Sequence, residues 1–158
     1  MTVWRPPNSI RVKAIGLAWH AGRLLVADVE TDRGTVKGVR PLGGSIDYGE
    51  TREQALHREF QEELATGITI AGPWHVFENI YRHEGQLGHE IVFAADVELV
   101  DTSLYARAEI LFSENDGTPA RARWVNPADL SAAGLQLFPN GLGAWLESRS
   151  SSVKNVAP

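Results

Sequence analysis

The sequence contains no cysteine, which excludes several classes of protein at once. A chain without thiols cannot be a disulfide scaffold, a thiolate zinc domain, an iron–sulfur protein or a cysteine-nucleophile enzyme. No run of residues approaches the roughly 18 consecutive apolar residues of a membrane-spanning helix. Residues 1–8 hold two prolines, one arginine and no apolar segment, unlike a signal peptide. We therefore expect a cytoplasmic protein that does not associate with membranes.

A surplus of positive charge is also missing. Fifteen lysines and arginines stand against 20 aspartates and glutamates, which gives a formal net charge of −5. This balance argues against a nucleic-acid polymer or an anionic membrane as a partner held by bulk charge. It is compatible with a small anionic substrate whose charge is screened by metal ions.

The length and composition predict one globular domain. The chain has 158 residues, of which 43% are hydrophobic and 22% charged, and these are ordinary values for a single soluble domain. We find no internal repeat and no linker that would divide residues 1–158. The polar residues from about 149 to 158 lack periodicity, so we expect a flexible tail there.

The order of predicted elements favours a mixed sheet with helices on its faces, in the α/β (α+β) class. Residues 10–19 begin with alternating apolar and charged positions and then become wholly apolar, which predicts a strand with one half-exposed and one buried end. Further strands are predicted at 23–29, 35–41, 68–70, 74–81, 90–99 and 121–125, with a segment that is mostly loop at 101–119. A short helix should begin at Pro127, with Asn126 as its N-cap, and end at about Leu130, and a C-terminal helix should cover 140–148.

The clearest helix covers residues 51–65. Thr51 and Gln54 fit a capping box, in which each side chain satisfies a free backbone N–H of the other residue. Apolar residues recur every four positions from Leu56 to Leu64 and form the stripe that faces a core. Gly67 is the predicted stop signal.

Three carboxylates share one face of this helix, because Glu59, Glu62 and Glu63 stand at positions i, i+3 and i+4. Like charges at this spacing repel each other, and the helix dipole disfavours anions in the last turn. Divalent cations would reverse both penalties, and carboxylates without sulfur or a histidine cluster suit Mg²⁺ or Mn²⁺. The alternative is a solvated acidic face on a purely structural helix.

A glycine-rich turn, residues 41–50, leads into the helix. Gly43 and Gly44 allow a tight backbone path and close approach to a ligand or metal. Gly44 and Gly49 have the spacing of a phosphate-binding loop, but Glu50 stands where that motif requires lysine. We therefore favour a metal site over a bare anion-binding loop.

The segment Gly44–Thr66 resembles the signature box of the Nudix hydrolases. Five residues separate Gly44 from Glu50, and seven more precede the run Arg58-Glu59-Phe60-Gln61-Glu62-Glu63. The flanks also agree, with β-hairpin material before the box and a tryptophan-containing strand late in the chain. The departure is at the end of the box, where Ala65 and Thr66 replace the usual glycine and aliphatic residue.

The resemblance implies a Nudix-like α/β/α sandwich with a mixed central sheet. It implies hydrolysis of a pyrophosphate bond in a nucleoside diphosphate linked to another group, a small-molecule substrate. By resemblance, the glutamates Glu59, Glu62 and Glu63 would bind magnesium or manganese, and the carbonyl group of Gly44 would complete the metal shell. Arg58 would pair with Glu50 and complete the catalytic set. A homodimer is common in the family.

The general base and the substrate contacts are less defined by the sequence. Candidates for the base are Glu109, Glu114 and Asp116. Candidates for substrate contact are Gly43, Tyr48 and Tyr81; the position of Tyr81, about fifteen residues past the box, is typical of relatives that hydrolyse dinucleoside polyphosphates. The five histidines show no ligand spacing. A non-catalytic Nudix-like module that senses nucleotides or binds a partner is the alternative, although such modules usually lose a box glutamate and this chain has all of them.

Overall fold

The computed structural model describes residues 3–154, which form an eight-stranded sheet and two α-helices. The elements are β1 (Ile10–His20), β2 (Arg23–Glu30), β3 (Val36–Ser45), α1 (Arg52–Leu64), β4 (Ile68–His83), β5 (Gln86–Leu99), β6 (Glu109–Ser113), β7 (Pro119–Val125), β8 (Gln136–Leu137) and α2 (Leu142–Lys154). Two 3₁₀ helices, η1 (Thr102–Ala106) and η2 (Pro127–Asp129), complete the fold.

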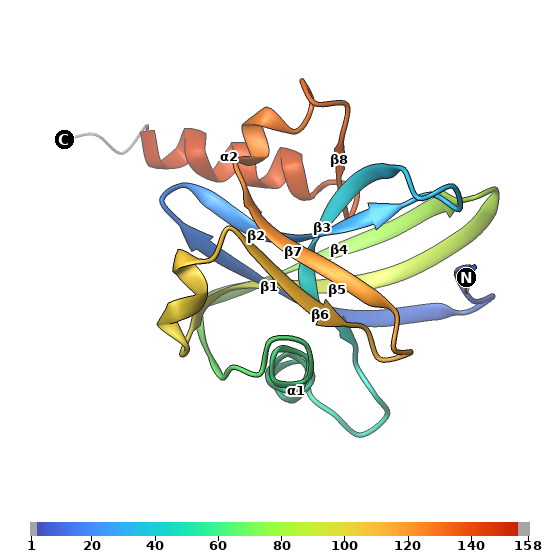
Figure 1. Cartoon of the computed structure of the whole chain (residues 1–158), viewed down its shortest axis with the longest axis horizontal. Helices are drawn as coiled ribbons and strands as arrows, with labels where there is room; N and C mark the ends of the chain where they lie inside the picture. Colours follow the sequence, from blue (N-terminus) through green and yellow to red (C-terminus); the bar gives the residue numbers. More distant parts are fainter. Residues whose placement is uncertain (1–2, 155–158) are drawn as a thin grey trace.

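The sheet is mixed and has helices on both faces, as the sequence predicts. The strand order is β4-β5-β1-β3-β2-β7-β6, with β8 beside β3. The pairs β1–β5 and β3–β8 are parallel, and the other pairs are antiparallel. Figure 1 shows α1 on one side of the strands and α2 on the other. The fold is therefore α+β, with β4 and β6 as its two edge strands.

Each helix covers its own hydrophobic cluster. Leu56 and Phe60 of α1 are buried in one cluster, while Leu142 and Leu146 of α2 are buried in the other. A Cβ atom at Gly16 of β1 would lie 2.8 Å from the ring of Phe60, so the helix approaches the sheet closely there. Burial of a side chain of this size stabilises the fold by about 1.5–3 kcal/mol. The apolar stripe predicted from the sequence is thus the face that fixes α1 to the sheet.

The capping box at the start of α1 is confirmed. The backbone N–H of Gln54 donates to the Thr51 hydroxyl at 3.1 Å, and the Thr51 N–H donates to the Gln54 side chain at 2.9 Å. The other end agrees with the predicted extent of 51–65, but the residue that ends the helix is Ala65 rather than the predicted stop signal Gly67. Ala65 has a left-handed conformation (φ 52°), and its N–H donates to the Gln61 carbonyl at 3.1 Å.

We expect the substitution Ala65→Gly to raise the free energy of unfolding by about 0.5–1 kcal/mol, since a left-handed backbone costs less at glycine than at alanine. Urea unfolding monitored by circular dichroism measures this change. Gln61→Gly, at an exposed position inside the same helix, is the matched control and should lower stability by about 1 kcal/mol. A loss of stability in Ala65→Gly would contradict the expectation.

The segment 101–119 is more ordered than the sequence predicts. It contains η1 and β6, and it buries Leu104, Ile110 and Phe112. The prediction of mostly loop is therefore wrong. The two predicted strands at 68–70 and 74–81 are one continuous strand, β4, whose pairing with β5 shifts in register between Ala71 and His75.

The exposed side of the first half of β1 is the apolar side. Ile10 and Val12 are 59% and 38% exposed, whereas the charged side chains of Arg11 and Lys13 are turned toward Glu90 on β5 at 3.1 and 3.3 Å. The alternation predicted a strand correctly. It did not reveal that the charged residues point inward.

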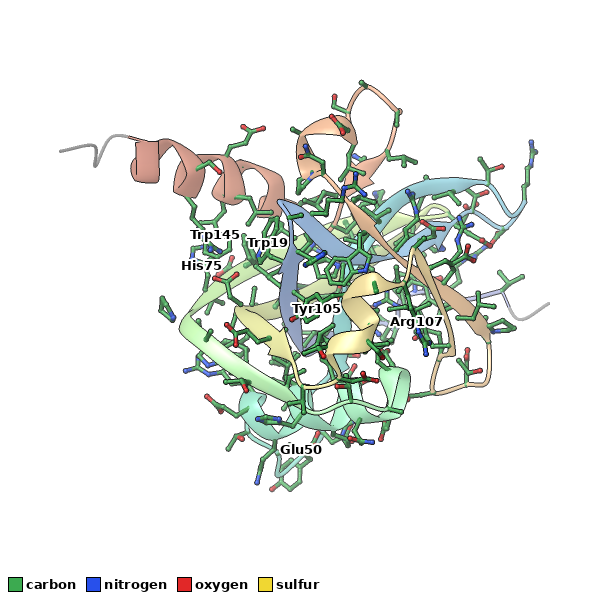
Figure 2. The ribbon with its side chains drawn as sticks, turned by 60° about the vertical axis from the view of Figure 1, so that its left-hand side comes forward. Trp19, Glu50, His75, Tyr105, Arg107 and Trp145 are labelled. Atoms are coloured by element: carbon green, nitrogen blue, oxygen red, sulfur yellow. The ribbon has the colours of Figure 1, made fainter. Side chains whose placement is uncertain are left out.

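The C-terminal helix is longer than expected. Helix α2 continues to Lys154, beyond the predicted helix end at residue 148, and residues 155–158 of the predicted tail lie outside the described part. Trp145 stacks on His75 of β4 with ring centroids 4.5 Å apart, as Figure 2 shows. Within the described residues, no helix combines the length and apolar content that a membrane crossing needs.

Candidate active site

Two adjacent glycines, Gly43 and Gly44, allow the backbone of β3 to lie close to both β1 and α1. Gly43 has a φ of 145°, and a Cβ atom there would overlap the Ala14 carbonyl oxygen. A Cβ atom at Gly44 would overlap the carboxylate of Glu59. Gly43, predicted as a substrate contact, is therefore buried against β1 in the structure. Gly44 is the point at which the strand backbone meets the first of the helix carboxylates.

Arg58 ties the loop after β3 to α1. Its Nε and Nη2 atoms donate to the two carboxylate oxygens of Glu50, each at 2.8 Å, and Nη2 also donates to the Ser45 carbonyl at 3.0 Å. The Asp47 N–H donates to Glu50 at 2.9 Å. Arg58 in the first place, together with this N–H group, lowers the pKa of Glu50 to about 2. Such a bidentate pair fixes both distance and orientation, and Figure 2 shows Glu50 in the loop beside α1.

Two of the three helix carboxylates also accept hydrogen bonds from Arg58. Its Nη1 atom donates to Glu59 at 2.9 Å and to Glu62 at 3.3 Å. Glu59 is buried, and this burial raises its pKa although Arg58 opposes the effect. Glu62 is partly exposed. One guanidinium group therefore serves as the counter-ion for carboxylates that would otherwise repel one another.

Glu63 has no comparable partner. It is buried, and among the described residues its Oε2 atom has no hydrogen-bond partner. Burial is the main reason that its pKa rises to about 8. Buried polar atoms in native proteins are almost always satisfied, so an orphaned carboxylate oxygen needs an explanation. A divalent cation is a ligand that fits an acidic, all-oxygen group of this kind.

Charged groups from other elements also shift the pKa of Glu63. Arg40 of β3 and Lys13 of β1 both lower its pKa, while Glu114 raises it. Arg40 donates a hydrogen bond to Glu114, which lies in the turn between β6 and β7. The β6–β7 turn is therefore held close to the carboxylates.

The structure separates the three candidates for the general base. Glu114 lies near Glu63 through its ion pair with Arg40. Asp116 accepts a hydrogen bond from the Thr118 N–H at 2.9 Å and so shapes the turn. Glu109 begins β6 and lies 3.9 Å from Arg121. Of the three, Glu114 is the one that the fold brings to the helix carboxylates.

A small cavity, which the sequence did not predict, opens beside Lys13 and Arg40. It has a volume of about 50 Å³ and is lined in part by Lys13, Arg40, Asn79, Glu90 and Phe138. Glu90 accepts a hydrogen bond from Asn79 at 3.2 Å. Burial alone would raise the pKa of Glu90, but Lys13 and Arg11 bring it below its usual value. Two signals in the sequence could have indicated this buried charge cluster. Arg11 and Lys13 alternate with apolar residues in a predicted strand, and Glu90 stands at the start of another apolar strand.

The two predicted tyrosines lie apart from the helix carboxylates. Tyr48 is fully exposed in the loop before α1. Tyr81 is half-buried on β4, where its hydroxyl group lies beside Arg11 and Glu90 and its burial raises its pKa to about 12. The structure therefore places Tyr81 beside Arg11 and Glu90 rather than beside Glu59, Glu62 and Glu63.

Two other features lie away from the box. Asp32, His83 and Glu84 offer ligand atoms within 4.8 Å of one another. However, Arg5 already donates two hydrogen bonds to Asp32, at 2.9 and 2.6 Å, and the Lys37 ammonium lies 2.7 Å from the His83 ring, so the protein's own cations occupy this cluster. A larger groove of about 980 Å³ runs between α2 and residues 126–137 and is lined by none of the box residues.

Comparison with known proteins agrees with this geometry. A family model described as NUDIX domain matches residues 11–146, most of the chain. The chain belongs to the Nudix family. Nudix hydrolases generally use divalent metals, and the orphaned Glu63 oxygen, the neighbouring carboxylates and the Gly44 backbone fit such an ion.

One curated relative is nucleoside triphosphatase NudI of Enterobacter sp. (strain 638), which is 43% identical over 56 residues. The match covers 34% of this chain and 40% of NudI, so the alignment spans less than half of the relative's length. The solved structure of the E. coli ORF135 protein has a TM-score of 0.54, 19% identity, and coverage of 94% and 95% of the two chains. The C. elegans Ap4A hydrolase has a TM-score of 0.51, 17% identity, and coverage of 91% and 97%. These structural likenesses show the fold alone.

Proposed function

We propose that this Nudix domain is a metal-dependent hydrolase that cleaves a pyrophosphate bond in a nucleotide derivative. The observation that carries the proposal is the buried Glu63 carboxyl group, which has an unsatisfied oxygen and lies on the same helix face as Glu59 and Glu62. A structural helix gains nothing from this arrangement, because burial of an unpaired carboxylate costs free energy. A site for divalent ions and a polyanionic substrate accounts for it.

Glu59, Glu62 and Glu63 would hold Mg²⁺ or Mn²⁺, together with the carbonyl group of Gly44. Bound there, the metal would supply charge neutralisation of the pyrophosphate and a more acidic water molecule. Arg58 and Glu50 are positioning residues, since their ion pair holds the loop against α1 and Arg58 also contacts Glu59 and Glu62. Arg40 and Lys13 would bind phosphate oxygens beside the metal site.

Glu114 is the proposed general base among the three candidates. It lies on the turn that faces Glu63, and its carboxylate is held there by Arg40. A base must reach the proton that it accepts within about 2.6–3.2 Å, directly or through one water molecule.

We propose nucleoside triphosphates and dinucleoside polyphosphates as the first substrates to examine. Support comes from the name of the relative NudI, a nucleoside triphosphatase, and from the Ap4A hydrolase among proteins of the same fold. The position of Tyr81 in the sequence favours the second class. The non-catalytic alternative, a nucleotide-sensing or partner-binding module, predicts binding without turnover.

The test is a hydrolysis screen over nucleoside triphosphates, diadenosine tetraphosphate and ADP-ribose with Mg²⁺ or Mn²⁺. We expect turnover of at least one compound, loss of turnover with a chelator, and a strong decrease in Glu62→Gln, which removes one ligand at an exposed position. Circular dichroism verifies that the variant is folded. Nucleotide binding by calorimetry without hydrolysis of any compound would favour the sensing module instead.

A further inference from the structure

Two positive side chains lie near the buried Glu63 carboxyl group without forming an ion pair with it. Arg40 and Lys13 both lower the pKa of Glu63. Within the described residues, however, the Oε2 atom of Glu63 has no hydrogen-bond partner. Buried carboxylate oxygens in native proteins are almost always satisfied, and arginine is a strong partner for them. The other contacts of the two cations have to explain why Glu63 is left without one.

Other carboxylates already hold both cations. Arg40 donates a hydrogen bond from Nη2 to Glu114, and the Lys13 ammonium group lies 3.3 Å from Glu90. The two pairs differ in burial, because the side chain of Glu90 is 8% exposed and that of Glu114 is 32% exposed. The pair of Arg40 and Glu114 can therefore be separated without placing a new polar group in the core.

Arg40 lies on the face of the sheet that α1 covers. It pairs in register with Ala27 of β2, and Ala27 is buried in the cluster beneath α1. Residues directly opposite each other on two antiparallel strands point to the same face. Ile110 of β6 belongs to that cluster too, and Figure 1 shows the β6–β7 turn on the α1 side of the sheet. Arg40 and Glu114 therefore form their ion pair on the face where Glu63 is buried.

We propose that Glu114 is a positioning residue that keeps Arg40 from binding Glu63, so that Glu63 stays available to a divalent cation. The inference rests on the metal site of the proposed function and adds a role for Glu114 that precedes any proton transfer. A hydrogen bond from Arg40 would occupy the Glu63 oxygen that now has no partner. An arriving metal ion would then have to break a largely buried ion pair, which is costly.

A double-mutant cycle on Mn²⁺ affinity tests the proposal, with the free ion measured by electron paramagnetic resonance and no nucleotide present. Glutamine at position 114 offers Arg40 only an uncharged acceptor, so Arg40 should turn to Glu63. We expect Glu114→Gln to weaken Mn²⁺ binding at least about tenfold, the scale typical of a lost outer partner of a metal ligand. Arg40→Met alone should bind Mn²⁺ at least as tightly as the wild type.

The decisive comparison is the effect of Glu114→Gln in the Arg40→Met background. No guanidinium group competes for Glu63 there, so the same change should weaken Mn²⁺ binding by less than about twofold. Asp116→Asn is the matched control, because it removes a negative charge from the same turn and retains an acceptor for the Thr118 N–H. It should also change the affinity by less than about twofold. Circular dichroism verifies folding, and Arg40→Gln is a second neutral replacement for the cycle.

The outcomes separate this inference from the proposed function. An equal loss of affinity in both backgrounds would show that Glu114 binds the ion itself or acts only through its charge, and would overturn the inference. Unchanged affinity in Glu114→Gln, or a wild-type chain that does not bind Mn²⁺, would overturn it as well. Because the cycle contains no nucleotide, a chain that shows the expected coupling but hydrolyses no compound would retain this inference and lose the proposed function.

Discussion

Replacing Glu63 with glutamine is expected to reduce hydrolysis by about 10³-fold or more, the scale on which loss of a charge-stabilising group at a reacting phosphate acts. Glutamine has nearly the same shape as glutamate, but it is neutral and binds divalent ions poorly. The measurement is kcat at saturating Mg²⁺, together with the Mn²⁺ dissociation constant. Glu53→Gln, on the first turn of the same helix, is the matched control and should change kcat by less than about twofold.

The same substitution has a second readout in the absence of metal. Burial raises the pKa of Glu63 from 4.5 to about 8 in the folded chain. A raised carboxyl pKa means that the folded state holds a proton that the unfolded chain releases. The stability linked to this proton is complete below pH 4.5 and is lost as the pH rises to about 8. The glutamine in Glu63→Gln does not titrate in this pH range, so the free energy of unfolding of the variant should depend less on pH.

Unfolding by urea at pH 5, 7 and 9 with a chelator present measures this difference. We expect the wild-type chain to lose stability across the series, by an amount on the order of 1 kcal/mol or more. At pH 9 the variant should be the more stable of the two. Equal pH profiles for the two proteins would show that Glu63 is not buried in the way that the structure describes.

The second large effect is expected at Arg58, where Arg58→Lys should reduce kcat by about 10²-fold. Lysine retains the charge but cannot donate from two parallel N–H groups, so it cannot hold both oxygens of Glu50. The loop 45–50 would then lose its anchor on α1, and Glu59 and Glu62 would lose their shared partner. Hydrogen exchange in that loop should become faster in the variant.

Arg52→Lys is the control for this experiment, because Arg52 lies on the same helix but packs on Trp74 and Phe93. We expect its turnover and loop exchange to remain close to those of the wild type. If Arg58→Lys retained full activity, charge alone would be sufficient at that position. The bidentate contact with Glu50 would then have no positioning role.

The parts of the fold that the sequence predicts well depend on local interactions. The capping box of α1 involves residues three positions apart, and the apolar stripe and the three carboxylates repeat within single helical turns. These features follow from helix geometry alone. The hairpin after β1 is equally local, since Trp19 pairs with Leu24 across a short turn.

The features that the sequence did not predict depend on residues far away in the chain. Arg11 points inward because Glu90, 79 positions later, supplies a buried carboxylate. Glu114 differs from the other candidate bases because Arg40, 74 positions earlier, reaches it. The strand β6 has five residues, and its order comes from pairing with β7 and from burial of Ile110 and Phe112. A pattern within a short window contains none of this information.

Arg58 also affects how a metal ion would arrive. Because its guanidinium group contacts one oxygen of Glu59 and one of Glu62, an incoming cation would meet carboxylates whose negative charge is already partly compensated. The net gain in electrostatic energy would be smaller, which favours an ion that enters and leaves together with a phosphate-bearing compound over one that stays bound between turnovers.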